Sequence, residues 1–128
     1  MKKIIFIIIL VSIIYLLLNN RNCPNKLAKK YLINNKNYCL LTANNQEQWQ
    51  RGLMFYKKPV DFDGMIFIFP DKQVRSFWNK NTYLDLDLYW MDDNKVVNKS
   101  YLPSILKSKT IVTVESKEKV DRVVEIIK

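Results

Sequence analysis

The sequence predicts a mainly β protein: a jelly-roll-like antiparallel sandwich or barrel with one short helix, preceded by an N-terminal hydrophobic anchor helix. Two observations lead to this prediction. After residue 37, short apolar runs alternate with turn-forming residues, which is typical of strands. Before residue 20, an apolar stretch of helical length follows two lysines. The 128 residues, 48% hydrophobic and 12% aromatic, are enough for one compact domain with a core.

The chain begins MKKIIFIIILVSIIYLLLNNRNC, in which residues 4–18 are apolar except for Ser12. As a helix this run covers about 22 Å, close to the apolar region of a signal peptide and shorter than the roughly 30 Å core of a bilayer. No small residues follow it to mark a cleavage site. Residues 1–20 are therefore predicted to be an uncleaved signal anchor or transmembrane segment. Residues 4–18 would lie in the membrane, and the domain outside the cytoplasm.

Residues 21–37 are rich in Asn and Lys, and they are predicted to form a polar linker to a domain over residues 38–128. The two cysteines of the chain are Cys23 and Cys39. In an exported chain they could form one disulfide that closes a short loop. A buried Cys39 in a strand, with Cys23 free in the linker, fits the sequence equally well.

Short apolar runs bounded by turn residues predict seven strands beyond the linker. Asp71–Lys72 and Asp92–Asn94 are predicted to be hairpin turns, because Asp and Asn tolerate the backbone conformations that tight turns need. No internal repeat is visible. The expected strands cover residues 38–43, 63–69, 73–79, 85–91, 95–101, 109–115 and 121–127.

The one expected helix lies in NQEQWQRGLM. Asn44 or Asn45 can cap its start, since a short polar side chain can accept a hydrogen bond from a free backbone N–H. Trp49 and Leu53 share one face at helical spacing. Gly52 stands at the expected end of the helix, where glycine often adopts a positive φ.

Both glycines of the chain, Gly52 and Gly64, fall within RGLMFYKKPVDFDGMIFIF. Gly64 is expected to end a tight turn with positive φ and to lead into the strand MIFIF. Met54 and Met65 each lie near a glycine, and they are expected to fill gaps in the core rather than to bind a soft metal.

The formal net charge of +9 would suit a nucleic-acid binder only if the lysines gathered on one surface. They are scattered along the sequence, which predicts no nucleic-acid partner. The alternative is a basic surface that binds nucleic acid or another anionic polymer. The chain has no histidine, the commonest general base and metal ligand. Two cysteines without CxxC spacing also argue against zinc. No metal and no cofactor are predicted.

The segment FWNKNTYLDLD holds the candidate ligand-binding residues. Asp85 and Asp87 alternate with leucines, so on a strand both carboxylates project from one face and could bind a cation or act as an acid and base pair. The alternative is a solvated strand face. Asn81 and Thr82 either hold a bend between strands or, with Trp78 as a stacking wall, form the rim of a small cleft.

The chain carries three motifs in this order: QEQWQRGLMF, GMIFIF and FWNKNTYLDLDLYWMDDNKVV. They resemble the motifs of the domain of unknown function 192 family, whose members carry GLM, GM-F-F, FWM-NT and PLD-I in the same order. The resemblance covers roughly residues 38 to 127. It implies a compact, mostly β, jelly-roll-like domain, often found behind a signal peptide, with no established activity. The chain departs from the pattern at Tyr56, Asn79 and Asp85, and VESKEKVDRVVEII lacks the glycine turn that members usually carry.

These observations favour a membrane-anchored extracytoplasmic domain that binds a ligand or partner without catalysis. The alternative is a glycan-directed hydrolase that uses Asp85 and Asp87, which requires a carboxyl group with a raised pKa in a concave site. The partner can be a small molecule, a glycan or a protein. A pocket beside Trp78 and Asp87 is the observation that would favour a binding site here.

Overall fold

The structure is a computed structural model that describes residues 1–19 and 22–128. The predicted boundary between the anchor and the linker, at residues 20 and 21, lies outside the described residues. Ten further elements follow the N-terminal helix α1 (Lys2–Asn19). They are β1 (Lys29–Ile33), β2 (Lys36–Ala43), α2 (Gln46–Arg51), β3 (Gly64–Gln73), β4 (Ser76–Trp78), β5 (Leu86–Asp92), β6 (Lys95–Leu102), α3 (Ile105–Ser108), β7 (Thr113–Glu115) and β8 (Val120–Ile127).

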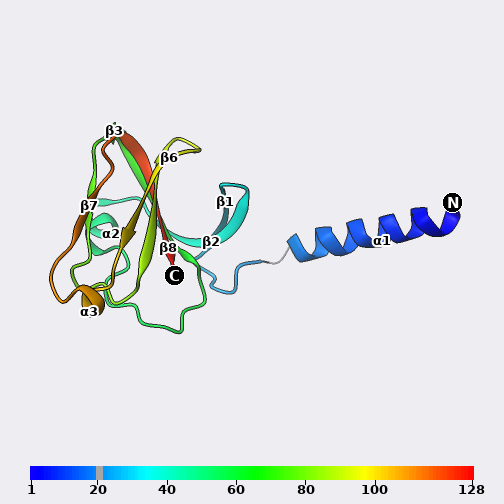
Figure 1. Cartoon of the computed structure of the whole chain (residues 1–128), viewed down its shortest axis with the longest axis horizontal. Helices are drawn as coiled ribbons and strands as arrows, with labels where there is room; N and C mark the ends of the chain where they lie inside the picture. Colours follow the sequence, from blue (N-terminus) through cyan, green and yellow to red (C-terminus); the bar gives the residue numbers. More distant parts are fainter. Residues whose placement is uncertain (20–21) are drawn as a thin grey trace.

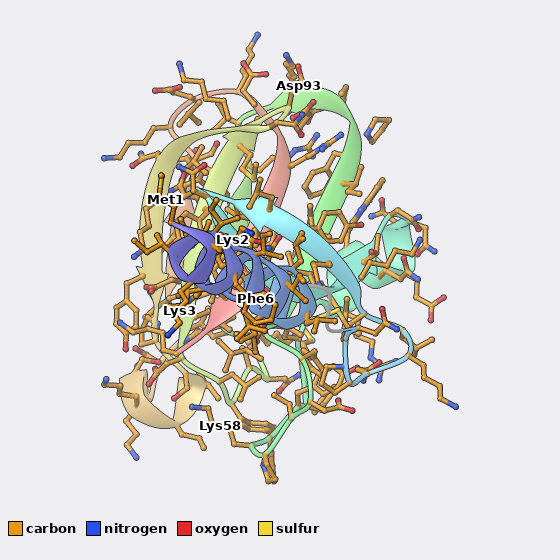
Figure 2. The ribbon with its side chains drawn as sticks, turned by 90° about the vertical axis from the view of Figure 1, so that its right-hand side faces the viewer. Met1, Lys2, Lys3, Phe6, Lys58 and Asp93 are labelled. Carbon is orange, nitrogen blue, oxygen red and sulfur yellow. A yellow bond between two sulfur atoms is a disulfide. The ribbon has the colours of Figure 1, made fainter. Side chains whose placement is uncertain are left out.

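The helix α1 stands apart from the β domain in Figure 1. Every side chain in residues 1–18 is exposed, including the apolar side chains on all sides of the helix. Lys2, Lys3 and Phe6 mark the start of α1 in Figure 2. Within the described part of the chain, no helix is both long enough and apolar enough to cross a membrane.

The β domain is built on one curled sheet of six strands in the order β1-β2-β3-β8-β5-β6, with β4 and β7 paired separately (Figure 1). This confirms a mainly β fold. Every neighbouring pair is antiparallel, as predicted for most of the fold, except β2 and β3, which run parallel. A hairpin cannot join parallel strands; here the chain crosses from β2 to β3 through α2 and a long loop.

The predicted polar linker, residues 21–37, contains the edge strand β1, so the linker prediction is wrong over residues 29–37. β1 and β2 form a hairpin joined by Asn34 and Asn35, whose φ angles are 48° and 63°. Asparagine tolerates this left-handed conformation, and a two-residue turn of this kind matches the twist of the strands. Charged residues are common on edge strands, which explains why the lysine-rich composition suggested a linker.

The predicted turn at Asp71–Lys72 is also wrong, because both residues lie inside β3. The turn predicted at Asp92–Asn94 is confirmed: β5 ends at Asp92, and Asp93 has a φ of 51°. The strand predicted over residues 109–115 is reduced to β7. The helix α3, which the sequence did not predict, precedes it and ends at Lys109 in the left-handed conformation.

The predicted short helix is confirmed as α2. The side chain of Asn45 accepts a hydrogen bond from the backbone N–H of Gln48 at 3.0 Å, which satisfies one of the free donors at the helix start. Gly52 ends the helix with a φ of 49°, and its N–H donates to the carbonyl of Gln48 at 2.8 Å. The positive φ predicted for Gly52 is therefore present.

Gly64 serves a different purpose from the predicted turn with positive φ, because its φ lies outside the left-handed region. It is the first residue of β3, where the backbone of β8 passes very close. A Cβ at this position would lie 1.8 Å from the carbonyl oxygen of Glu125. Only a residue without a side chain allows β3 and β8 to approach in this register.

Alternation along the strands divides the buried side chains between the two faces of the sheet. Leu86, Leu88 and Trp90 on β5 point to the inside of the curl, together with Val123 on β8. Their neighbours on the outer face pack with Ile33 of β1 in a second, smaller cluster. β8 carries buried apolar residues on both faces, Val123 toward the inside of the curl and Val124 in the outer cluster with Ile33 of β1.

Cys23 and Cys39 form a disulfide. The bond ties the segment before β1 to the middle of β2. The backbone N–H of Cys39 also donates to the Asp63 carboxylate at 2.8 Å, just before β3 begins. The start of the domain is thereby fixed to its central strands.

Candidate ligand-binding cavity

A cavity of about 730 Å³ opens between the inner face of the sheet, α2 and β4. It is within the size range of small-molecule sites in proteins. Aromatic rings form much of its wall. They come from three elements: Trp49 from α2, Phe67 and Phe69 from β3, and Phe77 and Trp78 from β4.

The aromatic walls are held in place by specific contacts. The indole N–H of Trp49 points at the carbonyls of Ala43 and Ile68, each at 3.1 Å, and its ring lies 5.0 Å from that of Phe69. Phe77 meets Phe67 edge-on, with ring centroids 4.8 Å apart. Aromatic pairs of this geometry stabilise one another beyond the area they bury, so the wall is preformed.

Glu125 on β8 lies in this cavity, buried to all but 4% of its surface. Its strand neighbours are uncharged: Met65 on β3 and Leu88 on β5. Its Oε2 atom has no hydrogen-bond partner. Burial raises the pKa of the Glu125 carboxyl to about 8, since the charged form is poorly solvated. At neutral pH the group is therefore mainly protonated and uncharged.

Glu125 is not among the predicted site residues, although the sequence carries a signal for it. In VVEII the flanking residues are apolar at both odd and even positions, so both faces of the strand are buried. A carboxylate in such a strand cannot reach solvent on either side. Charged residues are almost never fully buried without a partner, which makes this glutamate an anomaly that points to a site.

Three basic residues also line the cavity: Arg51, Arg75 and Lys80. Arg75 is fixed, because its guanidinium lies 3.6 Å from the Phe69 ring and donates to the carbonyl of Val120 at 3.1 Å. It also pairs with Asp71 at 3.0 Å. Hydrogen bonds from Gln73 and then Arg75 lower the pKa of Asp71, so this rim carboxyl is ionised.

Three of the five predicted ligand-binding residues, Trp78, Asn81 and Thr82, line the cavity, and the other two do not. Trp78 is 48% exposed and stands at the open side. Thr82 is buried, and its hydroxyl donates to the carbonyl of Lys80 at 3.1 Å. Asn81 has a φ of 52°, and its carbonyl accepts from the N–H of Phe55 at 2.9 Å. The bend between the strands is thus also a wall of the cavity.

Asp85 and Asp87 lie away from the cavity, near Tyr101. The N–H of Ser104 and the hydroxyl of Tyr101 donate to Asp85 at 2.9 and 3.1 Å, and these hydrogen bonds, Ser104 first, lower the pKa of its carboxyl. Asp87 lies 3.4 Å from the ammonium of Lys99 and 3.8 Å from that of Lys128. A hydrolase that used this pair would need a carboxyl with a raised pKa, whereas the pKa of Asp85 is lowered.

Asn79, which replaces the methionine of the family motif, lies behind the cavity wall and is fully buried. Its amide nitrogen donates to the Pro103 carbonyl at 2.8 Å and to the Ser108 hydroxyl at 2.9 Å, and its oxygen accepts from the N–H of Val112 at 2.8 Å. The amide therefore ties the segment between β4 and β5 to α3 and to the start of β7.

Gly52 and Met54 also line the cavity, whereas Met65 lies in the core beside it. A Cβ on Gly52 would come within 3.2 Å of the Phe67 ring. A side chain at Gly52 would therefore press on the Phe67 ring where the end of α2 lies against the aromatic wall.

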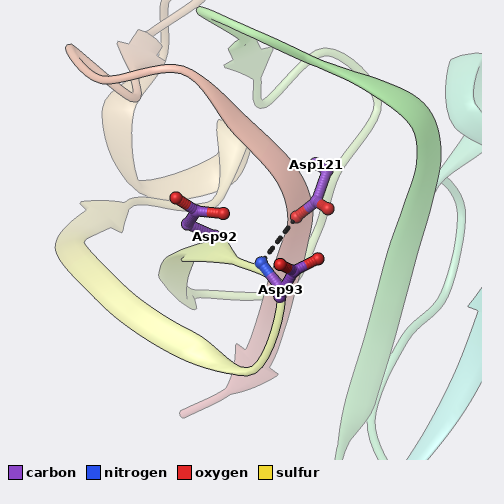
Figure 3. Close-up of side chains that lie close together, drawn as sticks. All are labelled: Asp92, Asp93 and Asp121. Carbon is purple, nitrogen blue, oxygen red and sulfur yellow. Dashed lines mark hydrogen bonds between the residues drawn. The ribbon is translucent and has the colours of Figure 1, made fainter.

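One group of three carboxylates among the described residues is close enough to share an ion: Asp92, Asp93 and Asp121 (Figure 3). The N–H of Asp93 donates to Asp121 at 2.9 Å, and the ammonium of Lys72 pairs with both Asp92 and Asp93. The charges are thus already partnered within the chain. Figure 2 places Asp93 at the opposite end of the domain from Lys58.

Two solved structures share this fold. A protein described as a candidate transcription regulator, from Sinorhizobium meliloti 1021, is 25% identical, with a TM-score of 0.63 over 77% of this chain and 77% of its own. A protein of unknown function from Novosphingobium aromaticivorans DSM 12444 is 22% identical, with a TM-score of 0.63 over 77% of this chain and 70% of its own.

No curated protein matches the sequence. The family model that matches is DUF192, described as uncharacterized ACR, and the match covers residues 30–128. It therefore includes the whole six-stranded sheet except the first residue of β1. The chain belongs to the DUF192 family, whose function is uncharacterised.

Proposed function

We propose that this protein is a membrane-anchored extracytoplasmic domain that binds a small ligand in the aromatic cavity without chemical turnover. The observation that carries the proposal is Glu125, a buried carboxyl with an unpartnered oxygen inside a cavity of ligand size. A buried polar atom without a partner costs about 1–3 kcal/mol of stability. A ligand that supplies the missing hydrogen bond recovers that free energy as affinity.

Binding without catalysis is supported by the other groups in the cavity. The chain has no histidine. The second carboxylate that lines the cavity, Asp71, is paired with Arg75 and lies on the exposed rim. Among the described lining residues, Glu125 is thus the one carboxyl with a raised pKa, and the other, Asp71, is held in its ion pair with Arg75 rather than free to exchange a proton with Glu125.

Indole is a suitable probe of the cavity, because it is planar and matches the aromatic walls. The test uses the full chain in lipid nanodiscs, with empty nanodiscs as the reference, and follows the indole N–H signals of the three tryptophans by NMR. Trp49 and Trp78 line the cavity and should shift as indole is added. Trp90 is fully buried in the core and bonded to Ser100, so its signal should stay in place.

Replacing Trp78 with alanine is expected to weaken indole binding about tenfold, the equivalent of about 1.4 kcal/mol, since the variant removes one stacking wall. Phe55 is the matched control, because it is an exposed aromatic residue that does not line the cavity. Phe55→Ala should leave the affinity unchanged. Equal effects of both variants, or no shift of Trp49 and Trp78 with indole, would contradict ligand binding in this cavity.

Membrane anchoring is supported by α1. A helix that is apolar on all sides requires an apolar environment, and the β domain does not cover this one. At 1.5 Å per residue, the 18 residues of α1 extend about 27 Å, which is short of the roughly 30 Å hydrocarbon core, so the proposal is that this apolar helix inserts in the bilayer as a signal anchor. The disulfide between Cys23 and Cys39 supports an oxidising location outside the cytoplasm.

The full chain is accordingly expected to remain in the membrane pellet after washes with carbonate and with high salt. A variant without residues 2–18 should appear in the soluble fraction after the same washes. Release of the intact chain by carbonate would contradict anchoring through α1.

A further inference from the structure

We infer that the cavity takes a neutral planar ligand whose carbonyl-type oxygen accepts a hydrogen bond from Glu125, and that it excludes organic cations. This inference rests on the proposed ligand-binding function and adds the chemical class of the ligand. An organic cation is the alternative ligand, because proteins also bind ammonium groups between aromatic walls and beside a carboxyl group. The charges around the cavity decide between the two.

The charged groups that share the cavity with Glu125 are mostly positive. Arg51 comes from α2, Arg75 precedes β4 and Lys80 follows it. Among the described residues that line the cavity, Asp71 on β3 is the only other acid. Because Asp71 is paired with Arg75, it cannot offset the remaining two cations. An organic cation would meet net repulsion at the entrance, and it would also have to ionise Glu125 in a site that disfavours the charge.

The strands beside Glu125 offer no charge that would change this balance. Its direct neighbours are Met65 on β3 and Leu88 on β5, and both are uncharged. On β8 itself, Asp121 and Arg122 do not line the cavity. Burial therefore keeps the Glu125 carboxyl protonated at neutral pH, and its pKa is about 8.

A protonated carboxyl group carries one O–H donor beside one acceptor oxygen. The matching partner is an amide-type edge, in which a carbonyl oxygen stands beside an N–H. Phe67 and Phe77 provide flat apolar walls in the same cavity, and Trp78 stands at its open side. A planar ligand with an amide-type edge would satisfy the hydrogen-bonding group and the walls together.

Benzamide and the benzamidinium cation test this inference, because they have the same shape and differ in charge. Both are titrated into the full chain in lipid nanodiscs, with the Trp49 and Trp78 signals as the readout. At pH 6, benzamide should bind at least tenfold more tightly than benzamidinium. At pH 9, where about a tenth of Glu125 is still protonated, benzamide should bind about tenfold more weakly.

Glu125→Gln separates the hydrogen bond from the charge, since the amide of glutamine is neutral and can donate at every pH. In this variant benzamide should bind within about threefold of the wild type at pH 6, and its affinity should not change up to pH 9. Tighter binding of benzamidinium, lost in Glu125→Gln, would overturn the inference while leaving ligand binding intact. Binding of indole but of neither benzamide nor benzamidinium would overturn it as well.

Discussion

Gly64→Ala is expected to destabilise the domain by more than about 4 kcal/mol, a large part of the roughly 5–15 kcal/mol that holds a typical domain folded. The added methyl group would lie 1.8 Å from the carbonyl oxygen of Glu125 and 2.9 Å from the carbonyl carbon. Both atoms belong to the backbone of β8, so no side-chain rotation can relieve the clash. The central pair β3–β8 would have to separate. Urea unfolding monitored by circular dichroism measures the loss.

Gly52→Ala is the control for this prediction, because the chain has only these two glycines. At Gly52 the contact is softer: the methyl group would lie 3.2 Å from the Phe67 ring, and the φ of 49° adds backbone strain. The expected cost is about 1–3 kcal/mol. If Gly64→Ala proved as stable as Gly52→Ala, the close approach of β3 and β8 would be contradicted.

Glu125→Gln is expected to stabilise the domain strongly at high pH and very little at low pH. In the wild type the carboxyl has an ordinary pKa of 4.5 when unfolded and of about 8 when folded. The unfolded chain therefore releases its proton first, and wild-type stability falls as the pH rises from about 4.5 to about 8. The difference, at 1.36 kcal/mol per pH unit, corresponds to about 5 kcal/mol.

The measurement is the free energy of unfolding of both proteins between pH 4 and pH 9. The two curves should nearly coincide at pH 4 and then diverge, with the variant more stable by about 3 to 5 kcal/mol at pH 9. Asp87→Asn is a suitable control, because Asp87 is paired with exposed lysines and its loss should not produce this divergence. Parallel curves for the wild type and Glu125→Gln would show that the carboxyl is not buried.

The parts of the fold that the sequence predicted correctly depend on local signals. The helix α2 follows from Asn45 and Gly52 at its two ends, and the turn at Asp93 follows from the residues that tolerate positive φ. Strands with alternating leucines, such as β5, were also visible. The motifs GLM, GMIFIF and FWNKNT identified the family, which the match over residues 30–128 confirms.

The parts that the sequence did not predict depend on contacts between distant segments. The strand β1 exists because it pairs with β2, and its lysines resemble those of a linker. The parallel pairing of β2 and β3 is set by the path of the connecting segment rather than by any local pattern. The local sequence around Gly64 predicts a turn, whereas the role of Gly64 depends on the backbone of β8 at Glu125, 61 residues further along the chain.

The candidate site was predicted only in part for the same reason. Trp78, Asn81 and Thr82 lie close together in sequence, and the structure places all three along the cavity. Asp85 was predicted as a site residue because it alternates with leucines on a strand, but its carboxylate accepts a hydrogen bond from the backbone N–H of Ser104 instead. Glu125 is surrounded by apolar residues in the sequence, and only the arrangement of the curled sheet shows that it faces a cavity.

The most direct test of the central claim, that a buried protonated carboxyl lies in the ligand cavity, is the titration of Glu125 itself. The carboxyl carbon of glutamate can be followed by ¹³C NMR in the full chain as the pH is raised, and Glu125→Gln identifies its signal. The structure predicts a midpoint of about 8 for Glu125. A midpoint near the ordinary value of 4.5 would contradict a buried, unpartnered Glu125 and with it the proposed site.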